Sequence, residues 1–203
     1  ANALRARGVR RGDRVGLFAR NSHQWVEASF ALSKIGAVVV TVNNRLAPSE
    51  VAYILNNAGA TALIVAAREL AAARQALADA PDCSLLIGIE AGDPALIDYE
   101  TLVAGSSEAE PELDHPLAAD EPSMLLYTSG TTGFPKGATY THGSTLLGMF
   151  VHVHAIGSRG THRVMLPSPL YSAAGMVTLL ATVLAAWIGF VDGPGAARKL
   201  AQM

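Results

Sequence analysis

The sequence has a single cysteine, Cys83, and a small net charge. The lack of further cysteines and the lack of a strong charge each exclude some classes of function. One thiol cannot build an internal disulfide framework and suits a reducing compartment, so a cytoplasmic location is expected. The formal net charge of −2 gives no basic footprint for nucleic acid and no polybasic membrane patch, so neither is expected as a partner. Cys83 precedes an apolar run at residues 84–87, which predicts a buried strand and an unreactive thiol.

The sequence also lacks a hydrophobic run well beyond the length of a membrane span. Its longest candidate, residues 175–191, is at the lower limit for a span and has no charged clusters to anchor its ends. A helix buried on all sides in a large α/β domain has the same composition, so a buried helix and no transmembrane span are expected. The 203 residues suit one domain, or one and a half.

A motif rich in glycine and hydroxyl side chains follows the apolar residues 124–126. Residues 127–138, YTSGTTGFPKGA, contain four aliphatic hydroxyls, three glycines and one lysine, Lys136. Glycines let the backbone turn and bring bare N–H groups close to a ligand, hydroxyls add donors, and lysine adds a mobile charge that suits phosphate. The motif therefore predicts a polyphosphate-binding loop. It is not a Walker A loop, because the second glycine of that motif would fall on Pro135 or Ala138.

The first ninety residues alternate between strand and helix patterns. Strands are predicted at residues 14–19, 38–42, 61–65 and 84–89. Their starts lie near residues 15, 37, 61 and 84, which leaves room for the helical crossover that a parallel pair requires. Helix ends are expected at Gly36 and Gly59, and a helix start at Pro48. The predicted fold class is α/β, with parallel sheets and helices on both faces.

Residues 104–122 have a different composition. They contain six acidic residues, no lysine or arginine, and several prolines, which predicts a solvated connector. The segments after the motif are predicted as a return strand of a hairpin at 138–141, a helix at 144–153 and a strand at 164–166.

The motif resembles the phosphate-loop signature of the adenylate-forming (AMP-binding) superfamily, which includes acyl-CoA synthetases, aryl-CoA ligases, luciferases and peptide-synthetase adenylation domains. Three other stretches add to the resemblance: residues 12–15 (GDRV) with Asn21, residues 35–46, and Pro169-Leu170-Tyr171 followed by Gly175. It runs from about Leu4 to the end of the chain. The resemblance implies an incomplete N-terminal domain of an adenylate-forming enzyme.

The resemblance also implies site residues. Those that match positions contacting the β- and γ-phosphates of ATP are Thr128, Ser129, Gly130, Thr131, Thr132, Gly133 and Lys136. Lys136 is the implied catalytic residue, and Thr131 matches a position close to the nucleotide-bound Mg²⁺. Tyr171, Ser172 and Gly175 lie where the family lines its acyl or aryl pocket. The alternative for Tyr171 and Ser172 is ordinary packing in a buried loop, and the alternative for Gly175 is a helix start. The implied substrates are a small carboxylic acid, ATP and CoA.

The sequence departs from the family in two ways. Ser172 stands where many members have histidine, and the later motifs and the C-terminal domain with its catalytic lysine do not appear. Residues 1–203 are therefore expected to be a partial N-terminal AMP-binding domain that is inactive alone. The favoured function is an ATP-dependent carboxylate–CoA ligase that activates a fatty or aryl acid.

Three alternatives stay open. The chain could be an adenylation domain that loads a carrier protein, or a non-catalytic nucleotide-binding remnant. The third is a dinucleotide-dependent oxidoreductase, suggested by Gly193-Pro194-Gly195, although the fingerprint for such enzymes needs a further small residue and an acidic one downstream.

Overall fold

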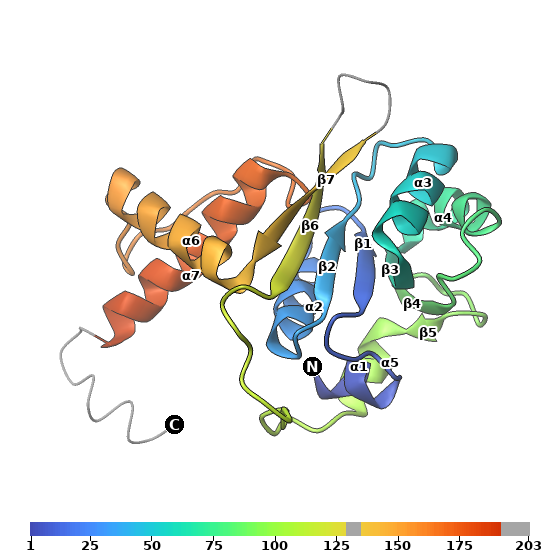
Figure 1. The fold of residues 1–203 in the computed structure, drawn as a ribbon, viewed down its shortest axis with the longest axis horizontal. Coiled ribbons are helices and arrows are strands. Elements are labelled where there is room, and N and C mark those ends of the chain that lie inside the picture. The colour runs from blue at the N-terminus through green and yellow to red at the C-terminus, as the bar shows by residue number, and fades with distance from the viewer. Residues whose placement is uncertain (129–134, 192–203) are drawn as a thin grey trace. The chain divides into compact units, whose positions relative to one another are not determined.

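A computed structural model describes residues 1–128 and 135–191 of the chain. The chain divides into two compact units, residues 1–142 and 143–203. The first unit is built on one seven-stranded sheet with the order β5-β4-β3-β1-β2-β6-β7 (Figure 1). The strands are β1 (Arg14–Phe18), β2 (Val38–Thr41), β3 (Ala60–Ala66), β4 (Leu85–Ile89), β5 (Ile97–Asp98), β6 (Pro122–Thr128) and β7 (Lys136–Thr141). All neighbouring strands are parallel except β6 and β7, which form an antiparallel hairpin.

Helices cover both faces of this sheet, as the alternating pattern predicts. The helices of the first unit are α1 (Asn2–Ala6), α2 (His23–Lys34), α3 (Pro48–Ala58), α4 (Leu70–Leu77, after a 3₁₀ turn at Ala67–Glu69) and α5 (Tyr99–Ala104). The α2 and α5 helices lie side by side, and the Tyr99 hydroxyl of α5 donates to Glu27 Oε2 of α2 at 3.2 Å. The α3 and α4 helices pack against each other. Right-handed crossovers between these strands place α2 on one face and α3 with α4 on the other.

The core on the α3 face depends on a close approach at Gly16 in β1. A Cβ atom at this position would lie 2.7 Å from Leu63 Cδ1 and 3.1 Å from Leu55 Cδ2. Both leucines are fully buried, in one cluster with Phe18. Side chains alternate along a strand, so Val15 in β1 faces α2 instead and is buried there. The sheet is therefore buried on both faces, which explains the continuous apolar runs of its central strands.

The helix ends follow the residues that predicted them. Gly36 and Gly59 have φ of 71° and 65°, left-handed values that favour glycine, and each lies just after a helix. Pro48 is the first residue of α3. The start of α2 is capped by Ser22, whose Oγ accepts from the Trp25 N–H at 3.2 Å.

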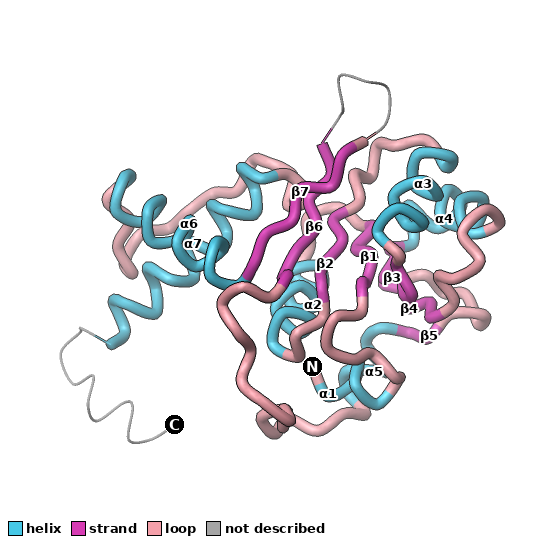
Figure 2. Tube along the Cα trace, in the orientation of Figure 1, coloured by secondary structure: helices cyan, strands magenta, loops and turns pink. Residues whose placement is uncertain are grey.

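The acidic connector has no helix or strand between residues 105 and 121 (Figure 2). It is nevertheless tied to the first unit. Arg11 forms an ion pair with Glu121 and donates to the His115 carbonyl at 3.0 Å, and Lys34 Nζ lies 2.6 Å from Glu110 Oε2. The connector thus runs along the amino ends of the strands as a strap before the chain enters β6.

The second unit contains α7 (Ala173–Val191) and all of α6 (His142–Ile156) except its first residue. The predicted helices at 144–153 and 175–191 are both present, and both are longer than predicted. Burial on all sides is wrong for α7, because Val183 and Trp187 are 42% and 58% exposed. None of the helices in the described ranges combines the length and apolarity that a membrane crossing requires.

The strand predicted at residues 164–166 is wrong. These residues have no regular secondary structure and pair with no strand in the described part of the chain. Met165 is 84% exposed. A short apolar run becomes a strand only where a neighbouring strand takes its backbone hydrogen bonds, and the described residues supply no such neighbour here.

Candidate nucleotide-binding site

Apart from Pro135, the described residues of the glycine-rich motif belong to the ends of β6 and β7 that face each other in the hairpin. The β6 strand ends at Thr128 and β7 begins at Lys136, and these two residues are directly opposite each other. The predicted return strand is confirmed and begins two residues earlier than expected. Directly opposite residues in an antiparallel pair have Cβ atoms about 4.5–5.5 Å apart on one face. The hairpin therefore brings a hydroxyl and an ammonium group, both exposed, together at the base of the loop.

The opposite face of the hairpin is anchored to the core. Tyr127 pairs with Gly137, and a Cβ atom at Gly137 would lie 3.0 Å from Tyr127 Cζ, so the ring occupies the place of a side chain. The Tyr127 hydroxyl donates to Asn57 Oδ1 in α3 at 2.7 Å. Burial raises the pKa of Tyr127 above its ordinary value, with a smaller contribution from Tyr53. A tyrosine hydroxyl is already protonated at neutral pH at its ordinary pKa, so it is available as a donor.

Within the described residues, Lys136 has no carboxylate at ion-pair distance. None of the described carboxylates neutralises its charge, which is therefore available to an anionic ligand. The other predicted phosphate contacts, Ser129, Gly130, Thr131, Thr132 and Gly133, lie outside the described residues, as does Gly193-Pro194-Gly195. The structure brings together only the two ends of the predicted set, Thr128 and Lys136.

Nowhere in residues 1–128 and 135–191 do three His, Cys, Asp or Glu side chains gather so that they could hold a metal ion. An Mg²⁺ ion that arrives with a nucleotide needs no such cluster, because it usually keeps several waters and binds through one or two protein groups and the phosphates.

The hairpin loop leaves the sheet at the carboxyl ends of the parallel strands, where open α/β sheets bind ligands. The same edge holds a polar cluster that the sequence did not predict. Glu69, after β3, is 5% exposed, and its Oε1 lies 3.5 Å from Arg20 Nε and 3.5 Å from Asn44 Nδ2. Since these residues follow three different strands, no local spacing in the sequence could reveal the cluster.

The predicted acyl-pocket residues belong to the second unit, and two of them have structural roles there. Ser172 precedes α7, where its Oγ donates to the Pro169 carbonyl at 2.7 Å and accepts from the Gly175 N–H at 3.2 Å. A Cβ atom at Gly175 would lie 2.1 Å from the Pro169 carbonyl oxygen. The turn before α7 therefore requires glycine at position 175. Tyr171, in the same turn, is half-buried.

Cys83 is buried, as predicted, and burial raises its pKa to about 11. Because the thiolate is the reactive form, this thiol is unsuited to nucleophilic chemistry.

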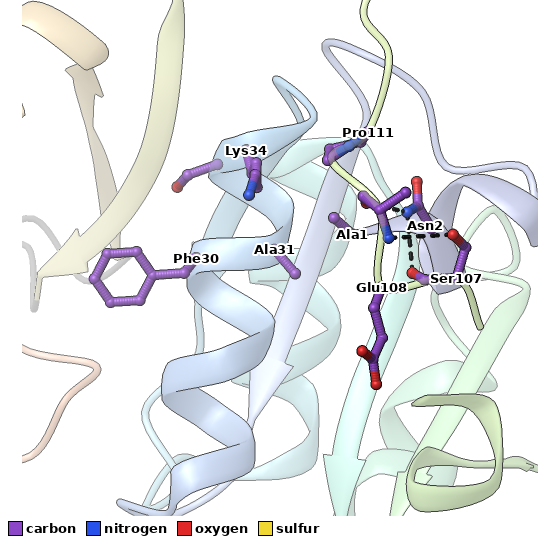
Figure 3. A pocket seen from close by; sticks show the side chains of 10 residues that line it. Ala1, Asn2, Phe30, Ala31, Lys34, Ser107, Glu108 and Pro111 are labelled. Carbon is purple, nitrogen blue, oxygen red and sulfur yellow. Dashed lines mark hydrogen bonds between the residues drawn. The ribbon is translucent and has the colours of Figure 1, made fainter. Parts of the chain in front are cut away.

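A pocket of about 620 Å³ lies at the opposite edge of the sheet, between the start of the chain, α2 and the connector (Figure 3). Asn2 Nδ2 donates to the carbonyls of Ser107 and Ala109 at 3.0 and 2.7 Å beside it. It contains none of the predicted site residues, so we assign it no part in nucleotide binding.

The fold and the hairpin define a class: a mostly parallel α/β domain in which a glycine-rich motif links the two strands of an antiparallel hairpin. Solved structures of adenylate-forming enzymes share this fold. The anthranilate CoA ligase AuaEII in complex with anthranoyl-AMP superposes with a TM-score of 0.84 at 28% identity, over 91% of this chain and 36% of that chain. The inhibitor-bound N-terminal domain of FACL13 from Mycobacterium tuberculosis gives 0.80 at 29% identity, over 91% and 45%.

The chain belongs to the AMP-binding enzyme family, whose family model matches residues 1–203. It is 33% identical over 190 residues to the long-chain-fatty-acid–CoA ligase FadD13 of Mycobacterium tuberculosis, over 89% of this chain and 35% of the relative. It is 36% identical over 181 residues to a feruloyl-CoA synthase of Amycolatopsis sp, over 88% and 34%. The chain thus spans about a third of the length of these curated relatives.

Proposed function

We propose that this chain provides the triphosphate-binding part of an ATP-dependent carboxylate–CoA ligase. One observation carries the proposal: the hairpin base places Thr128 opposite Lys136, which forms no ion pair with any described residue, where the glycine-rich motif begins and ends. The names of the relatives, which are acyl-CoA and aryl-CoA ligases, support the same reaction.

The proposed reaction has two steps. One carboxylate oxygen of the acid forms a bond to the α-phosphorus of ATP, the bond from that phosphorus to the oxygen bridging to the β-phosphate breaks, and pyrophosphate leaves. The thiol of CoA then attacks the acyl carbonyl carbon of the adenylate, loses its proton, and displaces AMP. Catalysis of such transfers rests mostly on positioning and on stabilising charge on the leaving phosphates.

Lys136 is proposed to neutralise the charge that develops on the leaving pyrophosphate, and the Thr128 hydroxyl to donate to the same phosphates. Ser129, Gly130, Thr131, Thr132 and Gly133 complete the proposed phosphate contacts. Mg²⁺, held mainly by the phosphates with Thr131 nearby, would neutralise further charge. Tyr171, Ser172 and Gly175 are proposed to line the acid pocket, with the Ser172 and Gly175 backbone held by the turn before α7.

The acid is proposed to be a fatty or an aryl acid. Relatives with names for both kinds of acid have similar identities, so a panel of acids of both kinds is the direct test. CoA is proposed as the acceptor; a carrier protein remains the alternative, and thioester formation with each acceptor distinguishes them.

The proposal is tested by Lys136→Ala in the intact protein, measured by acid-dependent ATP–pyrophosphate exchange. Loss of one preorganised charge at a developing anion should lower the exchange rate about 100-fold. The thermal unfolding midpoint should hardly change, because Lys136 is exposed. Lys34→Ala is the matched control, since it removes an exposed lysine at the other edge of the sheet.

Equal losses of exchange in the two lysine variants would contradict the proposed role. Nucleotide binding without any exchange in the intact wild-type protein would instead favour the non-catalytic remnant.

A further inference from the structure

Asn57 is an exposed residue of α3, outside the glycine-rich motif, whose side chain is directed at that motif. Its Oδ1 accepts from the Tyr127 hydroxyl at 2.7 Å, within the range of a good O–H···O hydrogen bond. Tyr127 is the residue before Thr128. The bond therefore links a helix that packs on the sheet to the strand residue where the loop leaves the sheet.

The Tyr127 ring itself is fixed by two contacts. On one side it packs against the core cluster that includes Leu55 and Val51 of α3. On the other it covers Gly137, where a Cβ atom would lie 3.0–3.2 Å from Cζ, Cε2 and the hydroxyl oxygen. Since Tyr127 and Gly137 are cross-strand partners, one ring contacts both strands of the hairpin at the same level.

The next pair of residues along the hairpin is Thr128 and Lys136, on the other face. Rotation or shear of the hairpin base would displace both side chains at once. The β7 strand lies at the edge of the sheet, so β6 is the one described strand that pairs with it. A hydrogen bond from α3 to the hairpin is then a direct restraint on the position of the base.

We propose that Asn57 is a positioning residue for the nucleotide-binding hairpin: through the Tyr127 hydroxyl it holds Thr128 and Lys136 where they meet the phosphates. This rests on the proposed function of the hairpin. Asn57 touches neither the substrate nor the reacting atoms, so its effect is expected in the use of ATP and not in the use of the acid.

The test is steady-state kinetics of the intact protein with ATP as the varied substrate. Asn57→Ala and Tyr127→Phe each remove one partner of the bond. Each should lower kcat/KM for ATP about twofold to tenfold, the range of one net hydrogen bond, mainly through a higher KM. The KM for the acid should stay unchanged. A merely structural defect would instead reduce the fraction of active protein, and so kcat, without changing the KM for ATP.

Asn56→Ala is the matched control. Asn56 is the preceding residue of α3 and its Nδ2 donates to the Asp79 carbonyl at 2.7 Å, away from the hairpin. Both substitutions replace asparagine by the better helix former alanine, so helix propensity cannot explain a difference between them. Asn56→Ala should leave the KM for ATP at the wild-type value.

Two further variants sharpen the assignment. Asn57→Asp keeps an oxygen acceptor for the Tyr127 hydroxyl and should restore most of the lost kcat/KM. The double variant Asn57→Ala with Tyr127→Phe should be no worse than either single variant, because both remove the same bond. A wild-type KM for ATP in Asn57→Ala, or additive losses in the double variant, would overturn the proposal.

A second measurement separates this inference from the proposed function. If the wild-type protein shows no ATP–pyrophosphate exchange, the ligase proposal fails. Amide hydrogen exchange of the nucleotide-free protein still tests whether the Asn57–Tyr127 hydrogen bond holds the hairpin base. The amides of Thr128 and Lys136 should then exchange faster in Asn57→Ala than in Asn56→Ala. Equal amide exchange rates in the two variants would overturn the positioning role of Asn57.

Discussion

Helices α3 and α6 are both rich in apolar residues, but only α3 buries them. The buried residues of α3 are Val51, Ala52, Ile54, Leu55 and Ala58, which lie on one side at helical spacing. In α6 none of the fifteen residues, all of them described, is buried. Leu147 and Val151 are 65% and 60% exposed. The two helices thus separate apolar composition from actual burial.

The difference teaches that a hydrophobic segment stabilises a fold only through the area that a partner removes from water. The α3 helix has such a partner, since its apolar side meets β1 and β3 across the cluster around Leu55 and Leu63. The apolar residues of α6 are spread around its circumference, so no single side is directed at a partner. Among the described residues, the first unit should therefore hold most of the free energy of unfolding.

The largest expected effect comes from truncating one leucine in each unit. Leu63→Ala, at a fully buried site in the first unit, should lower the free energy of unfolding by about 2–5 kcal/mol through lost burial and a cavity. Leu147→Ala, on α6, should change it by less than about 0.5 kcal/mol. Urea denaturation followed by tryptophan fluorescence measures both.

Similar losses for the two leucine variants would show that α6 is packed as tightly as the sheet core in solution, and the comparison between the units would then fail.

A smaller effect is expected from two glycines within the second unit. Gly175→Ala places a Cβ atom 2.1 Å from the Pro169 carbonyl oxygen, an overpacking that should cost about 1–3 kcal/mol. Gly148→Ala, in α6, meets no atom within 4 Å and should stabilise the helix by about 1 kcal/mol through helix propensity. Amide hydrogen exchange in α7 and α6 measures each change locally.

Faster exchange in α7 for Gly175→Ala and slower exchange in α6 for Gly148→Ala are the expected pair of results. No change in α7 would mean that the turn before Ala173 relaxes freely, and Gly175 would then lose its structural explanation.

The comparison also explains what the sequence could and could not predict. The strands and helices of residues 14–89 were predictable because local signals agree there: apolar runs of strand length, glycines at left-handed positions after α2 and α3, and Pro48 at a helix start. The short β5 and α5 elements were missed, since two strand residues and a six-residue helix carry no clear period. Their formation depends on β4 and α2, which lie elsewhere in the sequence.

The candidate site likewise has residues that the sequence could predict and residues that it could not. The motif and its Lys136 were predictable, because glycines, hydroxyls and a lysine gather within twelve residues. Asn57 and the Glu69 cluster were not, because only the folded sheet brings them to Tyr127 and to Arg20. At 164–166 the local apolar pattern predicted a strand, but none of the described strands pairs with these residues, so the prediction from local apolarity was wrong.

The smallest expected effect concerns charge, which also differs between the units. Residues 143–191 contain no Asp or Glu, whereas the connector of the first unit is acidic. The Arg11 guanidinium, with the Ala118 N–H, lowers the pKa of Glu121 from 4.5 to about 2. A carboxyl group with a lowered folded-state pKa stabilises the fold above its unfolded pKa, and this contribution is lost as the pH falls from 4.5 towards 2. Glu121→Gln should therefore be less stable than the wild type above pH 4.5, and the two should converge as the pH falls through this window.

Urea denaturation at a series of pH values measures this convergence, and hydrogen exchange locates it. Glu110→Gln is the control, because it breaks the exposed pair with Lys34 and should leave the free energy of unfolding nearly unchanged. The faster exchange that Glu121→Gln causes should be confined to the connector and to β6, whose entry the Arg11 pair holds against the rest of the first unit. A constant difference between wild type and Glu121→Gln from pH 6 to pH 2 would mean that the glutamine variant loses packing and not charge, and the electrostatic contrast between the two units would then have no measurable consequence.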